Sequence, residues 1–386
     1  MDLSTLFTAA LLFLATLGLD TVLYPRDIVL EAQVSPKIEG VMITHDMMND
    51  VLHDEVVRIS ATPSVVTKPV VHMAHENRVS LSLAQAMGLS KVALSLQTQV
   101  GYEPDQIKIY AFSENSVLRM LVTGDGHRRI GPFQQEIEQA KGESLIAMIR
   151  RATLVAMARI DPYTTALYLI QRHSDDKAFQ KPRAIIDFVK SGLPANGVSA
   201  ERSRFENLEG IMLLFTNAVQ EAHDKFAQAV ASDPSVHIPV LNLALTKLAL
   251  DRDAEGVALM RRMLKEAPPP DPLIRTIAYL TLAAGYMGIH ELAEGEAWIQ
   301  KALALTPDCP PAYGLWAEAE LARGNPEVAD ALRRKAADLP HTTRDYAEVA
   351  SLYFRLAWQD GGPVIRTPWE RRKDAVHIEG VPSTAP

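Results

Sequence analysis

The stretch Phe226-Ala-Gln-Ala-Val-Ala-Ser-Asp-Pro234 decides the fold, because the chain repeats its plan twice more. Met260-Arg-Arg-Met-Leu-Lys-Glu-Ala-Pro268 and Ile299-Gln-Lys-Ala-Leu-Ala-Leu-Thr-Pro307 show the same order of features. Each stretch is typical of a helix that stops just before a proline, which cannot continue a helix. Pro234 and Pro268 are 34 residues apart, and self-similarity at such a period indicates stacked repeats.

The region from Phe205 to Asp338 resembles the tetratricopeptide repeat, whose unit is a helical hairpin. In the first repeat, Gly210 and Ala222 take the two small positions where the helices of a hairpin cross. Phe226 follows at the stacking position. By the same resemblance, the later motif positions are Ala244, Gly256 and Met260 in the second repeat, Tyr279, Leu282, Ala283, Tyr286, Ile299 and Ala302 in the third, and Tyr313, Ala329 and Ala336 in the fourth.

Two positions depart from the repeat motif. Glu206 stands where the motif has an aromatic residue, so we expect the first repeat to be a terminal unit with a solvated outer face. The turn of the third repeat, residues 288–293, fits only if one or two residues are inserted. The helical spacing of Leu241, Leu245 and Leu248 predicts a helix without reference to the family.

The resemblance implies that the first helices of the hairpins line a groove that binds a protein partner of unknown identity. The groove positions are Arg204, Asn207, Ile211, Phe215, Ile238, Leu241 and Leu245, with Leu248, Leu280 and Ala284 beyond them. The alternative for the three leucines of the second repeat is a place in the core between repeats, which is the commoner role of leucine. Arg204 and Asn207 are the informative pair if they are exposed.

Residues 27–140 lack the repeat pattern and predict a small α+β module with a mostly antiparallel sheet. Alternating apolar positions or short apolar runs predict strands at 28–34, 92–100, 107–112 and 117–123, with a return strand at 128–133 after Gly124-Asp-Gly126. Helices are expected after Thr44, a typical N-cap residue, and over 79–87. Residues 143–200 predict a helical connector, with further helices over 162–172 and 182–191.

Residues 3–24 predict a transmembrane anchor, because about 20 mainly apolar residues can span a bilayer. The alternative is a cleaved signal peptide, which lacks a basic n-region here. The side of the membrane that holds the rest of the chain stays open. At the other end, residues 346–358 predict a helix that closes the repeat domain of 204–358, and residues 359–386 predict a flexible tail rich in proline and charge.

Composition excludes several classes of function. The chain has 386 residues and a net charge of −8, which disfavours nucleic acid as a ligand because phosphate binding needs surplus Lys and Arg. Cys309 is the only cysteine, so an intramolecular disulfide and a cysteine-based zinc site are excluded.

Three clusters of residues contain side chains that could bind a metal or a phosphate group. His45, Asp46, Asp50, His53, Asp54 and Glu55 lie within three turns of one predicted helix, but this is also the expected solvated side of that helix. His72-Met-Ala-His-Glu76 has its glutamate in the wrong place for a metalloprotease motif. Gly124-Asp-Gly126 is better explained by a hairpin turn than by a phosphate cradle. We therefore expect no catalytic residues, no metal and no cofactor.

The sequence thus predicts an α+β protein: a transmembrane helix, a small α+β module and an all-α tetratricopeptide-like solenoid. Its expected function is that of a membrane-anchored adaptor or scaffold for other proteins rather than an enzyme. The alternative is a ligand- or metal-binding sensor or enzyme built on residues 27–140.

Overall fold

The structure is a computed structural model that describes residues 28–40, 42–64, 68, 71–73, 105–125, 131–172, 179–193, 198–216 and 218–339. The chain divides into two compact units, with the main boundary between Tyr168 and Leu169. None of the described helices is long and apolar enough to cross a bilayer. The predicted anchor 3–24, helix 79–87, strand 92–100, closing helix 346–358 and tail 359–386 lie outside the described residues.

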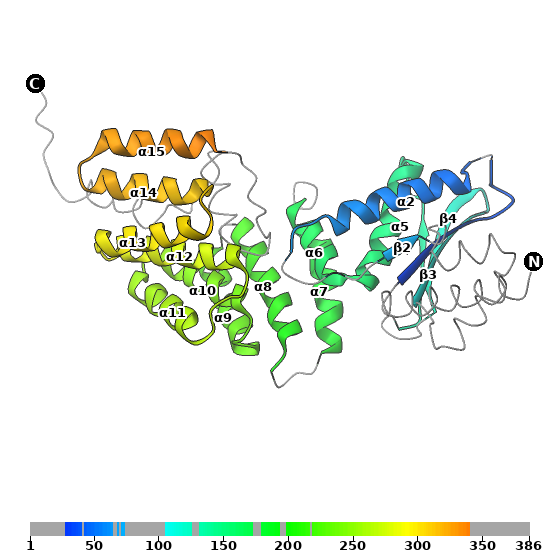
Figure 1. The fold of residues 1–386 in the computed structure, drawn as a ribbon. Helices are drawn as coiled ribbons and strands as arrows, with labels where there is room; N and C mark the ends of the chain where they lie inside the picture. Colours follow the sequence, from blue (N-terminus) through cyan, green and yellow to red (C-terminus); the bar gives the residue numbers. More distant parts are fainter. Residues whose placement is uncertain are drawn as a thin grey trace, which may run out of the picture. The chain divides into compact units, whose positions relative to one another are not determined.

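The first unit contains a five-stranded sheet in the order β2-β1-β3-β4-β5 (Figure 1). The strands are β1 (Ile28–Val34), β2 (Val71–Met73), β3 (Asp105–Glu114), β4 (Val117–Gly124) and β5 (Phe133–Glu138). Strands β1, β3 and β4 alternate between buried and partly exposed positions along their length, as strands with one buried face do. The register brings the buried members of neighbouring strands side by side, for example Ile109 opposite Val122.

Two helices cover the buried face of the sheet. Helix α2 (His45–Ser60) packs against β1, and α5 (Leu145–Ile160) packs against β4 and α2. The expected N-cap is confirmed, because the Thr44 hydroxyl accepts a hydrogen bond from the Met47 amide. Asp161 likewise caps α6 (Pro162–Gln171), with its carboxylate accepting from the Thr164 amide at 3.0 Å. Residues 143–200, expected as one connector, are thus divided between the two units.

The expectation of a mostly antiparallel sheet is wrong for the described strands. β1 runs parallel to both of its neighbours, whereas β3, β4 and β5 pair antiparallel. A short turn at Asn115-Ser116 joins β3 to β4, and both residues have positive φ, as a type I′ hairpin turn requires. The return strand expected at 128–133 is observed from Phe133 to Glu138, so it begins at the last residue of the expected segment, and residues 128–130 lie outside the described residues.

The second unit consists of α7 (Gln180–Gly192) followed by four helical hairpins in the described residues (Figure 1). The hairpins are α8 (Ala200–Phe215) with α9 (Val219–Ser232), α10 (His237–Ala249) with α11 (Asp253–Glu266), α12 (Pro272–Gly288) with α13 (Leu292–Leu305), and α14 (Pro310–Ala322) with α15 (Pro326–Asp338). The first helices contact one another in order, α8 with α10, α10 with α12 and α12 with α14. The predicted repeat domain is therefore confirmed as a stack of hairpins.

Each hairpin crosses at a pair of small buried residues that are twelve positions apart. The pairs are Gly210 with Ala222, Ala244 with Gly256, Ala283 with Gly295, and Ala317 with Ala329. A side chain at Gly210 would meet the ring of Phe226, because an added Cβ would lie 2.4 Å from its Cε1 atom. The close approach of the two helices therefore depends on glycine or alanine at these positions.

The last three hairpins share one turn geometry. Asp251, His290 and Gly324 occupy the same place in their turns, and each has a φ between 59° and 82°. The residue that follows each of these three also makes the same contact in every turn. The amides of Arg252, Glu291 and Asn325 each donate a hydrogen bond, at 2.9 Å, to the carbonyl five residues earlier. The insertion expected in the third turn is therefore wrong. The residues that lengthen the third repeat lie instead between α11 and α12, where Asp271 caps α12.

The expectation that Glu206 faces solvent is also wrong. Glu206 is buried, and its carboxylate accepts a hydrogen bond from the Ser232 hydroxyl at 2.6 Å. Helix α7 packs against α8, so the first hairpin does not form the end of the array. A buried carboxylate is tolerated when a donor satisfies it, and Ser232 at the end of α9 supplies that donor.

Candidate functional site

The residues predicted to bind a partner lie on the first helices of the first three hairpins, and the structure divides them by exposure. Asn207, Ile211, Ile238 and Leu241 are buried, with at most 5% of their surface exposed. Asn207 accepts a hydrogen bond from the Asn242 side-chain amide at 2.7 Å, which ties α8 to α10. Ile238 and Leu241 belong to a core cluster shared by α10, α11 and α12, and Leu248 is buried as well.

The remaining groove positions are partly exposed. They are Arg204 and Phe215 on α8, Leu245 on α10, and Leu280 and Ala284 on α12. Phe215 contacts the ring of Phe179 at a centroid distance of 6.1 Å. Since α8, α10 and α12 touch in order, these side chains come from adjacent helices of one layer. Partner binding at these positions stays a prediction.

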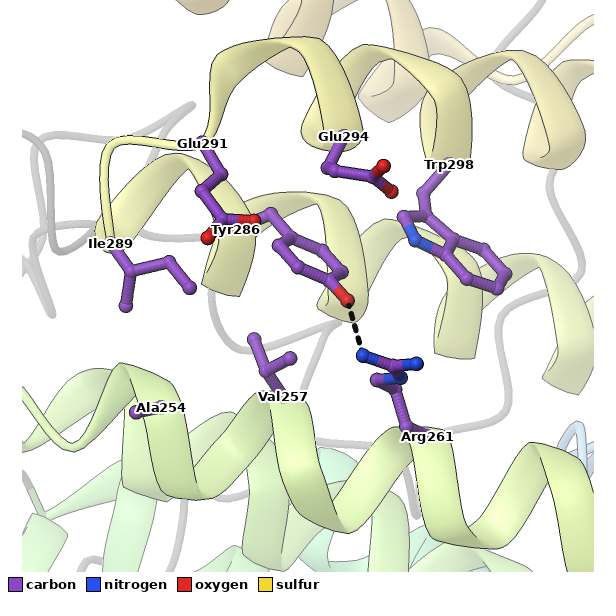
Figure 2. A pocket seen from close by; sticks show the side chains of 8 residues that line it. All are labelled: Ala254, Val257, Arg261, Tyr286, Ile289, Glu291, Glu294 and Trp298. Carbon is purple, nitrogen blue, oxygen red and sulfur yellow. Dashed lines mark hydrogen bonds between the residues drawn. The ribbon is translucent and has the colours of Figure 1, made fainter.

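A cavity of about 400 Å³ lies between the second and third hairpins and contains none of the predicted groove residues (Figure 2). It is formed by α11, the end of α12 and the start of α13. Its lining residues are Ala254, Val257, Arg261, Tyr286, Ile289, Glu291, Glu294 and Trp298. The lining therefore combines apolar and aromatic side chains with three charged ones.

The charged groups of this cavity are unequally engaged. The Arg261 guanidinium donates to the Tyr286 hydroxyl across 3.3 Å. Figure 2 shows this pair on one side of the cavity, and the carboxylates of Glu291 and Glu294 on the α13 side. Neither carboxylate forms a hydrogen bond or ion pair with any described residue. Two exposed carboxylates thus share the cavity with one exposed guanidinium, whose hydrogen bond to the neutral Tyr286 hydroxyl leaves its charge in place.

Trp298 gives the cavity an aromatic wall with a defined position. Its ring contacts Tyr279 at a centroid distance of 5.4 Å, and the Lys301 ammonium lies 3.6 Å from its centroid. This geometry is that of a cation–π interaction, in which the ring face attracts positive charge. The Trp298 ring is therefore held in place, and the ammonium group of Lys301 already lies against it.

The histidine and acidic cluster of the first unit does not form a metal site in the described residues, where no three His, Cys, Asp or Glu side chains are placed to hold an ion. His45, Asp46, Asp50, His53 and Asp54 are exposed on the outer side of α2. Residues 74–76 and 126 of the two other candidate motifs lie outside the described residues.

Glu55 differs from its neighbours and corrects the expectation of a solvated face. It is 2% exposed, and its carboxylate accepts a hydrogen bond from the Tyr168 hydroxyl at 2.9 Å. The side chains of Arg58 and Arg150 approach the other oxygen to 3.4 Å and 3.6 Å. Arg58 lies on α2 itself, but Arg150 and Tyr168 are brought to Glu55 by α5 and α6, and such distant partners leave no local signal in the sequence.

The cavity between α11 and α13 was not found from the sequence. Its members are spread over 45 positions, and Tyr286 alone among them was assigned a motif position. One signal was present: Glu291 and Glu294 stand at the start of a second helix next to Trp298, a large aromatic residue that the motif does not require.

Comparisons with known proteins find similar solved structures but no matching family. The chain matches no protein-family model and no curated protein. Among solved structures it is similar to PilW, described as a widely conserved type IV pilus biogenesis factor, at 17% identity over 57% of this chain and 96% of that chain, with a TM-score of 0.39. Residues 41 to the end of MamA from Desulfovibrio magneticus RS-1 match at 17% identity over 48% of this chain and 98% of that chain, with a TM-score of 0.35.

A third similar structure is the Cut9–Hcn1 hetero-tetramer of the APC/C, at 16% identity over 49% of this chain and 34% of that chain, with a TM-score of 0.38. At these identities and TM-scores the likenesses do not indicate what this chain binds. The hairpins α8–α15 form a stack of helical repeats with recurring crossing pairs and turns, the architecture that the resemblance to the tetratricopeptide repeat predicts.

Proposed function

We propose that this protein is a scaffold that holds a segment of another protein along the first helices of its hairpin array. One observation carries the proposal: Phe215, Leu245, Leu280 and Ala284 remain partly exposed on three first helices that contact one another in order. Apolar side chains that stay accessible in a row on a rigid layer favour protein binding. Rigid stacked repeats offer a preformed surface, so binding requires little ordering of the receptor.

The proposal assigns the protein no catalytic role and leaves the partner's identity open. Arg204 lies on α8, where the row starts, and its side chain is partly exposed. It is the one charged residue among the predicted groove residues. Buried groove positions such as Leu241 cannot contact a partner directly, because their side chains have no exposed surface. They pack beneath the exposed positions of the same layer.

Site-specific photo-crosslinking in cells tests the proposal on the full chain. A photoreactive phenylalanine analogue replaces Leu245 or Leu280, and a matched control replaces Lys265, which is exposed on α11. We expect a protein adduct from positions 245 and 280 and a much weaker one from 265. Equal adducts at all three positions, or none, would contradict the proposal.

A charge reversal provides a second test. Arg204→Glu is expected to weaken capture of the crosslinked partner, whereas Lys265→Glu makes the same change of charge away from the row and should leave capture intact. Loss of capture in both variants would show a general charge effect and would contradict a role for the row.

We further propose that residues 3–24 anchor the scaffold to a membrane as a single span, with the side that holds the array left open. The uncharged apolar run of residues 3–19 supports this. Cell fractionation of the full chain and of a chain lacking residues 3–24 tests it. The full chain should remain with membranes after a high-salt wash, and the shortened chain should not.

A further inference from the structure

We propose that the cavity between α11 and α13 binds a lysine or arginine side chain of a partner polypeptide. None of the residues that line this site belongs to the first-helix row, so the inference goes beyond the proposed function and does not depend on it. The cavity's volume of about 400 Å³ is ample for one long side chain and its flanking backbone.

The walls suit the aliphatic stem of such a side chain. Val257 and Ile289 offer apolar surface, and Tyr286 and Trp298 contribute rings. Lysine and arginine pack their methylene groups along apolar surface while the charged head reaches polar partners. The lining of the cavity contains both kinds of surface.

The charges of the lining favour a cationic occupant over the alternatives. Glu291 and Glu294 have no partner among the described residues, and with Arg261 they leave the lining with a net charge of −1, which one ammonium or guanidinium group would offset. An anionic occupant would meet two carboxylates for the one guanidinium of Arg261, which already donates to Tyr286. An apolar occupant would remove water from the two carboxylates without replacing its hydrogen bonds, which is unfavourable.

The structure also contains an internal example of the same attraction. Lys301, one turn after Trp298 on α13, already places its ammonium 3.6 Å from the centre of the indole ring. The aromatic ring and the nearby carboxylates both favour positive charge at this end of the cavity.

The test uses the full chain and three small probes: the N-acetyl, N-methylamide derivatives of lysine, norleucine and glutamate. Norleucine has a lysine-like stem without the charge. Binding is followed by NMR from the indole N–H signal of Trp298, assigned with Trp298→Phe. We expect saturable shifts with the lysine probe that weaken as salt is raised, at least about fivefold weaker binding of norleucine, and none of glutamate.

Matched variants identify the groups responsible. Glu291→Gln with Glu294→Gln should weaken the lysine probe at least about fivefold. Glu221→Gln is the control, because Glu221 is exposed and is the third residue of α9, as Glu294 is of α13. Arg261→Gln should strengthen binding of lysine, since it removes the like charge from the cavity.

Three results would overturn the proposal. Equal binding of lysine and norleucine would show an apolar site. Preferred binding of glutamate that is lost in Arg261→Gln would show an anion site. The absence of a saturable shift with every probe would show that the cavity does not bind side chains. Each of these results leaves the crosslinking test of the first-helix row unaffected, so the two proposals fail separately.

Discussion

Replacing Gly210 by alanine tests the reason for the small residues at the helix crossings. The new Cβ would lie 2.4 Å from Cε1, 2.7 Å from Cδ1 and 2.8 Å from Cζ of Phe226. The Phe226 ring is fully buried, so it has no free space in which to turn away. Overpacking of this kind costs about 1–3 kcal/mol, and three contacts with a rigid ring place Gly210→Ala at the upper end.

Alanine also favours the helix over glycine by about 1 kcal/mol. The expected net loss for Gly210→Ala is therefore about 2 kcal/mol. Gly256→Ala provides a comparison, because its Cβ would meet the flexible end of Leu248 at 2.8 Å, and the gain and the cost nearly cancel. Gly192→Ala, near the end of α7, is the control, since nothing lies within 4 Å of its Cβ.

Chemical unfolding of the full chain followed by tryptophan fluorescence measures these effects. All four tryptophans lie at or after position 298, beyond the first unit, so the signal reports on the second unit. The expected order of stability is Gly192→Ala at or above the unsubstituted protein, Gly256→Ala close to it, and Gly210→Ala clearly below.

A double-mutant cycle with Phe226→Leu isolates the contact. Gly210→Ala should destabilise the Phe226→Leu background less than it destabilises the original protein, with a coupling of about 1–2 kcal/mol, as is found between residues in contact. The reasoning is refuted if Gly210→Ala leaves stability unchanged, or if its effect is the same in both backgrounds.

Three further changes probe single contacts. Tyr168→Phe removes the hydroxyl that donates to the buried Glu55 carboxylate and should lower the stability of the first unit by about 1–3 kcal/mol, as measured by hydrogen exchange of α2 amides; unaltered exchange would contradict it. Ser232→Ala removes the donor to buried Glu206 and should cost a similar amount by fluorescence-detected unfolding, whereas Ser232→Thr should retain part of the stability. A hydrogen bond from Arg151 lowers the pKa of Glu143 below its ordinary value of 4.5, so this pair stabilises the fold above that value and ceases to do so as the pH falls through the lowered pKa. Arg151→Gln should therefore lower stability at pH 7 but not at a pH below the lowered pKa, and an equal loss at both would refute this.

The sequence predicted those features that depend on local patterns. Small residues at Gly210 and Ala222, the proline at Pro234 and the helical spacing of the apolar residues all repeat along the chain, so the hairpins could be placed. The cap at Thr44 was predicted because a cap needs only residues within one turn. Had the twelve-residue spacing been applied to Ala283, it would have identified Gly295 and removed the supposed insertion in the third turn.

Features that depend on distant partners could not be predicted. The burial of Glu55 requires Tyr168, which is far along the chain, and the burial of Glu206 requires Ser232 on the neighbouring helix. The parallel pairing of β1 depends on connections between strands rather than on the composition of any one strand. The cavity beside Trp298 is likewise formed by three helices and leaves no spacing that marks it.

The pairing of β1 has a consequence for the order in which the chain acquires structure. Ile28 pairs with Asp105, so a nascent chain must reach the third strand before the first can take its final place. In the second unit each hairpin finds its partners in adjacent segments. Contacts that are close along the chain form faster than distant ones. On refolding from denaturant, we therefore expect the helical array to recover first and the sheet to follow as a separate, slower phase.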